Sequence, residues 1–69
     1  MMAQALLVLL FLIPRESLYK DGLSRGRQAT RDEAFGEAIE AFDQAIAARP
    51  WEARAWSGRG YARLKAQLP

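Results

Sequence analysis

Few side chains in this sequence are suited to acid–base, nucleophilic or metal-binding chemistry. Its 69 residues include no histidine and no cysteine, which removes the commonest general base, the thiol nucleophile and the usual ligands of zinc. Ser17, Ser24 and Ser57 have no evident neighbour that would activate a hydroxyl group. The glycines occur singly, in no pattern that cradles a phosphate. We therefore expect no catalytic, cofactor or metal site, and we expect that the protein is not an enzyme.

The chemistry that the sequence does offer is that of charged groups, which occur in blocks. Residues 1–14 carry no charged side chain, residues 15–31 carry a balance of +3, residues 32–48 carry −5 and residues 49–69 carry +4. Segments of opposite charge attract each other when they pack as antiparallel neighbours, although exposed pairs contribute little energy. The acidic central block would lie close to any phosphate backbone that followed the basic segments, so we expect no nucleic-acid partner.

The chain begins with an apolar segment. Ala5 to Ile13 is an unbroken apolar run that ends at Pro14. As a helix, residues 1–14 would be about 21 Å long, whereas a bilayer core needs roughly 20 apolar residues. This length disfavours a simple spanning helix. It leaves open a signal-like segment, a membrane anchor or an apolar helix packed on the rest of the protein, and hence a membrane-associated or a cytoplasmic location.

Two predicted helices follow. Residues 16–31 favour helix apart from Gly22 and Gly26, which leave a flat strip against which another backbone can approach closely. Thr30 to Glu33 has the form of a capping box, so we expect the next helix to begin there. The apolar residues of that helix recur at three- and four-residue steps and therefore share one side. These residues are Phe35, Ala38, Ile39, Phe42, Ala45 and Ile46.

Pro50 ends the second helix, because proline cannot continue the hydrogen-bond ladder, and helical character resumes over residues 51–67. Ala55, Gly58, Ala62 and Ala66 form a stripe of small residues in this last helix. Phe42 and Trp56 are expected in the core. Trp51 either packs against the last helix or is an exposed partner contact.

The interval from Ala38 to Pro50 resembles the end of a tetratricopeptide repeat. Ala38, Phe42, Ala45 and Pro50 reproduce the Ala-x3-Phe-x2-Ala-x4-Pro pattern of that family, whose period is 34 residues. Counted in this frame, the first repeat begins at Tyr19 and has Gly26 at its small eighth position. The second begins at Ala53, with Trp56 and Gly60 at the fourth and eighth positions. Residues 19–69 thus resemble about one and a half repeats.

The resemblance implies an all-α fold, an antiparallel helix-turn-helix stack of three helices over residues 15–69, preceded by the apolar helix of residues 1–14. The small residues Gly26, Ala38, Ala45 and Gly60 are expected where helices cross closely. Arg25 and Arg59 stand where the family favours leucine. One and a half repeats are fewer than the three or so that usually fold alone, so we expect the apolar N-terminal helix or a second chain to supply further packing surface.

The resemblance also implies a protein–protein interaction module, because members of this family bind peptides in a groove lined by the first helix of each repeat. The positions that usually face the groove correspond here to Lys20, Leu23, Arg27, Arg31, Arg54, Ser57, Tyr61 and Lys65. Each set of four steps by three and four residues and so forms one stripe along its helix. Both stripes are basic, which favours an acidic peptide segment or carboxyl terminus as the partner.

Three alternatives stay open. The basic stripes are also what a solvated helix face looks like, with no partner at all. A small membrane-tethered protein would use its apolar N-terminus as the anchor, with Arg15 and Lys20 near anionic headgroups. Self-association of the chain is the third. The sequence does not decide among them, and it leaves open whether the chain is complete or part of a longer array.

Overall fold

A computed structural model of the chain describes residues 13–68 as three helices joined by short turns. These are α2 (Arg15–Arg31), α3 (Phe35–Ala48) and α4 (Ala53–Gln67). No strand is present in this part of the chain. The prediction of an all-helical fold is therefore confirmed for the described residues. The predicted apolar helix over residues 1–14 lies outside them, apart from Ile13 and Pro14.

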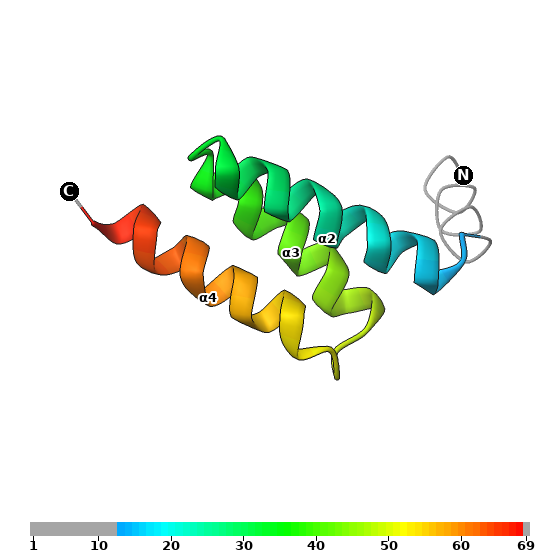
Figure 1. The fold of residues 1–69 in the computed structure, drawn as a ribbon. Coiled ribbons are helices and arrows are strands. Elements are labelled where there is room, and N and C mark those ends of the chain that lie inside the picture. The colour runs from blue at the N-terminus through cyan, green and yellow to red at the C-terminus, as the bar shows by residue number, and fades with distance from the viewer. Residues whose placement is uncertain (1–12, 69) are drawn as a thin grey trace, which may run out of the picture.

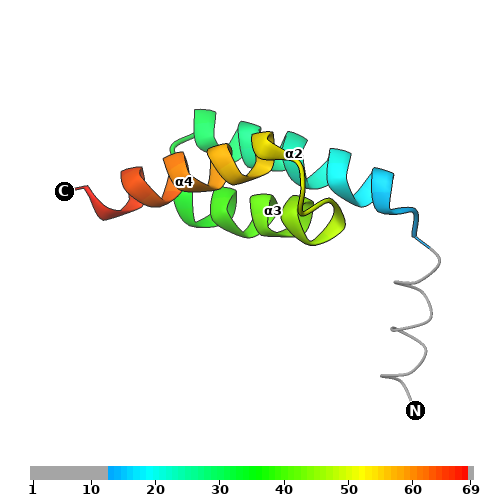
Figure 2. The ribbon, with the colours of Figure 1, turned by 90° about the horizontal axis from the view of Figure 1, so that it is seen from below.

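The helices form two layers. α2 and α3 make an antiparallel hairpin, and α4 runs antiparallel to α3, in the direction of α2 (Figure 1). The view from below shows α2 and α4 on the same side of α3 (Figure 2). α3 packs against both of its neighbours, whereas α2 and α4 touch each other only narrowly. The outer sides of α2 and α4 therefore remain available at the surface.

The turn between α2 and α3 differs from the prediction. α2 continues through Arg31, and the Thr30 hydroxyl donates a hydrogen bond to the Gly26 carbonyl oxygen (2.7 Å) instead of capping a new helix. The backbone N–H groups of Glu33 and Ala34 donate to the carbonyl oxygens of Thr30 (3.1 Å) and Ala29 (2.8 Å). These two bonds form a Schellman motif, which ends a helix. The predicted capping box was wrong, because its residues complete the preceding helix.

The core is built from small residues. Its buried hydrophobic members in residues 13–68 are Tyr19, Leu23, Ala29, Ala38, Ala41, Phe42, Ala45, Ala48, Ala55 and Ala62. Seven of these ten are alanine, so helix backbones must come close together before van der Waals contacts can form. A Cβ atom added to Gly22 would lie 2.7 Å from the backbone oxygen of Ala41, which shows how closely α2 approaches α3.

Phe42 is a large side chain that reaches all three helices. It projects from α3, its residue is 2 % exposed, and its ring lies against Gly26 of α2 and Gly58 of α4. A Cβ atom added to Gly26 would lie 2.7 Å from this ring, and one added to Gly58 would lie 2.5 Å away. Both distances are too short for an ordinary carbon–carbon contact. The two glycines therefore form a slot that the Phe42 ring fills.

Two expectations about the core were wrong. Gly60 is exposed, and a Cβ atom added to it would meet nothing within 4 Å, so Gly58 and not Gly60 provides the close approach of α4. Trp56 was expected in the core but is 49 % exposed. The expectations for Gly26, Ala38, Phe42 and Ala45 were confirmed, since all four are buried.

A polar link joins α2 to α3 on the side away from α4. The Arg25 guanidinium donates to Asp21 (2.9 Å) and to the Gln44 side-chain oxygen (2.6 Å). The Gln44 amide nitrogen donates in turn to Asp21 (2.9 Å) and to the Leu18 carbonyl oxygen (2.9 Å). The hydrogen bonds from Gln44 and then from Arg25 lower the pKa of Asp21 below its ordinary value. Arg25 thus replaces the expected leucine contact with a polar one.

Within residues 13–68, no helix is both long enough and apolar enough to cross a bilayer.

The Phe42 slot gives a paired prediction. Gly58→Ala should lower the free energy of unfolding by roughly 1–3 kcal/mol, since the added methyl group overlaps the ring. Gly60→Ala, two residues away in the same helix, should raise it by about 1 kcal/mol through helix propensity alone. Urea denaturation followed by circular dichroism measures both changes. Equal effects of the two substitutions would refute the slot.

The α2–α3 turn gives a second prediction. Glu33 has a φ of 60°, a left-handed conformation that costs a residue with a side chain about 1–2 kcal/mol. Glu33→Gly should therefore raise the free energy of unfolding by about 1 kcal/mol in the same denaturation experiment. Asp32→Gly is the control, because Asp32 has a φ of −82° and glycine there relieves no strain. A gain in stability for the control alone would contradict this account of the turn.

The Asp21 link predicts a sensitivity to acid. The pKa of Asp21 is lowered in the folded state, so its contribution to stability is complete above the unfolded-state pKa of about 3.9 and is lost as the pH falls through the folded-state pKa. The difference in melting temperature between the parent chain and Asp21→Asn should therefore shrink as the pH is lowered from neutral to below about 4. A difference that stays constant over this range would show that the ionised form makes no contribution.

Candidate protein-binding groove

A hollow lies between α2 and α4, on the side of these helices that faces away from α3. It has a volume of about 480 Å³. Its lining consists of Arg27, Thr30, Arg31, Phe42, Ser57, Gly58 and Tyr61. Because Gly58 has no side chain, the hollow extends inward as far as the Phe42 ring. The same packing that closes the core therefore also shapes this surface.

A second hollow continues the first toward the C-terminal ends of α2 and α4. It has a volume of about 400 Å³ and shares Thr30, Arg31 and Tyr61 with the first. Its other lining residues are Glu33, Phe35, Lys65 and Leu68. We call the two adjoining hollows the α2–α4 groove. Side chains of both signs and several apolar groups are exposed along it.

The bases that line the groove have no acidic partner in the described residues. Within residues 13–68, neither Arg27, Arg31 nor Lys65 has a carboxylate within 4.0 Å. Arg31 donates to the neutral Gln28 side chain (2.8 Å), and the Lys65 ammonium lies 5.6 Å from the centroid of the Tyr61 ring. The basic side of the groove is thus left without an internal counterion in this part of the chain.

Four of the seven bases outside the groove are paired with acids. Arg25 contacts Asp21 (2.9 Å), Arg49 contacts Glu16 (3.7 Å) and Glu52 (3.8 Å). These contacts hold three carboxylates away from the groove, whereas the Glu33 carboxylate lines it. The groove is therefore able to offer its guanidinium and ammonium groups to an anionic ligand.

Arg59 of α4 also lies outside the groove. Its Nε atom is 3.1 Å from an Asp43 oxygen, although the N–H does not point at that oxygen closely enough for a hydrogen bond. The guanidinium also lies over the Trp56 ring, 5.7 Å from its centroid.

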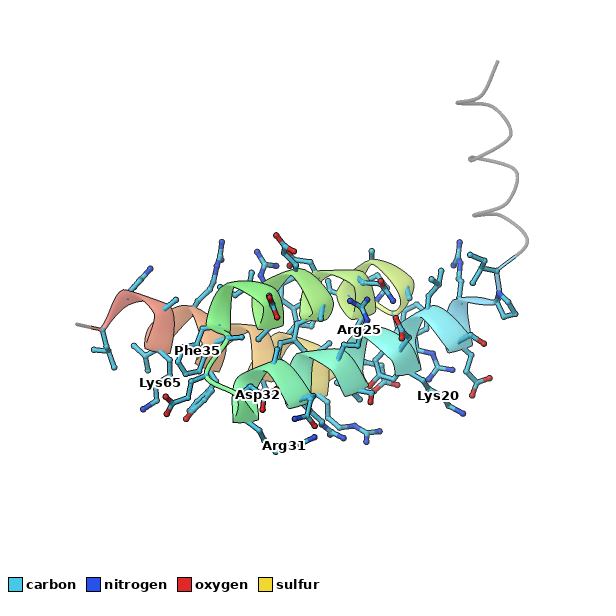
Figure 3. The ribbon with its side chains drawn as sticks, turned by 90° about the horizontal axis from the view of Figure 1, so that it is seen from above. Lys20, Arg25, Arg31, Asp32, Phe35 and Lys65 are labelled. Carbon is cyan, nitrogen blue, oxygen red and sulfur yellow. The ribbon has the colours of Figure 1, made fainter. Side chains whose placement is uncertain are left out.

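The structure brings together five of the eight residues that the sequence analysis placed at a partner-binding face. Arg27, Arg31, Ser57, Tyr61 and Lys65 all line the α2–α4 groove. Figure 3 shows Arg31 of α2 and Lys65 of α4 on one side of the molecule, with Lys20 on the same side of α2. Residues from the two predicted stripes therefore lie at one continuous surface.

The other three predicted residues lie elsewhere. Lys20 and Arg54 are exposed but line neither hollow, and Lys20 lies 3.4 Å from Glu16. Leu23 is only 7 % exposed and belongs to the hydrophobic core. Its place on α2 turns it inward, so it does not present its side chain to a partner. Without Leu23, the residues that line the groove are mostly polar or aromatic.

Several lining residues were not anticipated. Thr30 was interpreted as a helix cap, Phe42 as a core residue, and Gly58 as one member of a small-residue stripe. The stripe of small residues did contain a signal that Gly58 lines a hollow, because a glycine beside a large ring leaves open space. Glu33 and Leu68 lie in a turn and at a helix end, where periodicity gives no information.

The polar groups of the groove are suited to binding an anionic ligand. No group of three acidic side chains that could hold a metal ion occurs within residues 13–68. The groups that the groove offers are guanidinium, ammonium and hydroxyl donors beside aromatic rings. Such groups bind carboxylates through charge-assisted hydrogen bonds.

Comparison of the chain with models of protein families, with curated proteins and with solved structures finds no match.

Proposed function

We propose that this protein is an interaction module, similar in helix arrangement to a tetratricopeptide repeat, which binds an acidic peptide segment in the α2–α4 groove. The observation that carries the proposal is the position of its unpaired bases. Six bases have no carboxylate within 4.0 Å in the described residues, and three of them, Arg27, Arg31 and Lys65, line this one groove. A partner with carboxylates would supply the missing counterions.

The lining favours a peptide over a small anion. The two hollows adjoin each other, so an extended chain would contact several side chains in succession. Tyr61 and Phe35 offer aromatic surface beside the bases, and Ser57 and Thr30 offer hydroxyl groups. This combination suits a peptide that alternates acidic and apolar side chains, since successive side chains of an extended strand point in opposite directions.

The helix arrangement supports the likeness to a tetratricopeptide repeat. α2 and α4 lie on one side of α3 and run in one direction (Figure 2). Gly26, Ala38 and Ala45, which the family resemblance placed at helix crossings, are buried. The groove between two parallel helices is where the resemblance placed the partner.

Charge reversal in the groove tests the proposal. The probe is a short fluorescein-labelled peptide in which Glu alternates with Leu, and its matched control replaces Glu by Gln. Arg27→Glu/Arg31→Glu should weaken binding of the acidic peptide by about tenfold or more, because attraction becomes repulsion at two contacts. Fluorescence anisotropy at low salt measures this, and circular dichroism checks that the variant is folded.

The control variant is Arg15→Glu/Arg54→Glu. Both of these bases are exposed and lie outside the groove, and the double substitution changes the net charge by the same amount. It should leave most of the binding intact. Equal losses for the two double variants would mean that the peptide senses only the overall charge. Equal affinity for the acidic peptide and its Gln counterpart would overturn the proposal outright.

A further inference from the structure

α4 has a second free side, which faces away from the groove and borders α3 at Arg59. A hollow of about 160 Å³ on this side is lined by Trp56, Arg59, Gly60 and Arg63. Leu64, which is 58 % exposed, follows Gly60 by one helical turn and lies on the same side. We call these five residues the outer face of α4. It consists of apolar side chains around a notch at Gly60, with arginines along one edge.

The equivalent side of α2 shows what such a face accommodates. The residues that precede Trp56, Arg59, Gly60 and Arg63 by 34 positions are Gly22, Arg25, Gly26 and Ala29. This side of α2 is covered by α3, an antiparallel helix. There Gly22 meets the backbone of α3 and Gly26 meets the Phe42 ring. On α4 the corresponding Gly60 has nothing within 4 Å of an added Cβ atom. Its notch is therefore shaped like the α2 site but is open.

Charge selects the kind of helix that would fit. α4 contains Arg54, Arg59, Arg63 and Lys65 and no acidic residue. Within residues 13–68, Arg63 has no carboxylate within 4.0 Å. A second copy of α4 would bring like charges together, which costs energy. A helix with acidic residues beside its apolar stripe would instead be attracted.

Trp56 favours a protein partner over a membrane surface. Its indole N–H donates to the Pro50 carbonyl oxygen (2.7 Å), so the polar group of this side chain is already used inside the molecule. Tryptophan at a membrane interface commonly keeps its N–H for the headgroup region. In addition, Gly60 at the centre of the face contributes no side chain to bury in lipid, but its notch admits a side chain from an approaching helix.

From these observations we infer that the outer face of α4 binds an acidic amphipathic helix, which lies antiparallel to α4. A large apolar side chain of that helix enters the notch between Trp56 and Leu64, and flanking carboxylates pair with Arg63 at the edge. This is a second binding surface, separate from the α2–α4 groove. Here an amphipathic helix would pack its apolar side against a hydrophobic surface. It does not depend on the proposed function of the groove.

The chain itself provides a probe with the required pattern. A synthetic peptide of residues 34–49 contains Phe42 among small residues, with Glu37, Glu40 and Asp43 beside them. The full-length chain is titrated with this peptide after fluorescein labelling, and anisotropy is recorded. The Trp51→Phe background leaves Trp56 as the only tryptophan, so a blue shift of its emission on binding reports burial of the outer face directly.

Two matched glycine variants test the site. Gly60→Gln fills the notch with a polar side chain and should weaken peptide binding by about tenfold or more. Gly36→Gln is the control, because Gly36 is the other glycine with open space around it and it lies at the start of α3. A Cβ atom added at either position has nothing within 4 Å, so both variants should remain folded. Arg63→Glu should also weaken binding, whereas the groove variant Arg27→Glu/Arg31→Glu should not.

The inference is overturned if Gly60→Gln and Gly36→Gln bind the peptide equally well. That result would mean that the peptide replaces the internal α3 or occupies the groove. Loss of binding in the groove variant with no loss in Gly60→Gln would assign the peptide to the groove. The inference also fails if the peptide does not bind while vesicles of anionic lipid shift the Trp56 emission, or if self-association without peptide produces that shift.

Discussion

The contact of the Phe42 ring with Gly26 and Gly58 determines how the three helices fit together. Phe42 is the only side chain larger than alanine that α3 contributes to the set of fully buried residues in the described part of the chain. Its ring has room only because the facing residues on α2 and α4 lack side chains. α2 and α4 are consequently held on the same side of α3, and the groove between them has Phe42 at its base. The groove and the core thus depend on one ring.

The distribution of charge follows from the same layering. The acidic residues are concentrated in the segment that forms α3, and the bases in the segments that form α2 and α4. With α3 in a layer of its own, its carboxylates reach only those bases at the sides of the neighbouring helices, such as Arg59. Arg27, Arg31 and Lys65 point away from α3 and stay without carboxylate partners in the described residues. The other ion pairs of the described residues use carboxylates outside α3, and the same layering leaves the groove basic.

Periodicity and helix-breaking residues were enough to predict three helices and most of the buried residues, because both depend on local sequence. The predicted end of α2 was wrong, because Thr30 to Glu33 satisfies the pattern of a helix start as well as that of the observed turn. Only the left-handed backbone of Glu33 distinguishes the two, and no glycine marks it. The predictions for Leu23 and Trp56 were wrong for a different reason. Helical spacing gives the side of a helix on which a residue lies, but not which helix, if any, covers that side.

The alanine-rich core also bears on how the protein responds to temperature. Unfolding increases the heat capacity in proportion to the apolar surface that becomes exposed to water. A core in which seven of ten buried hydrophobic residues are alanine releases little such surface for its length. The stability curve of this fold is therefore broad and shallow, and its free energy of unfolding changes slowly between cold and warm conditions. Close backbone contact in place of large side chains is thus expected to flatten the dependence of stability on temperature.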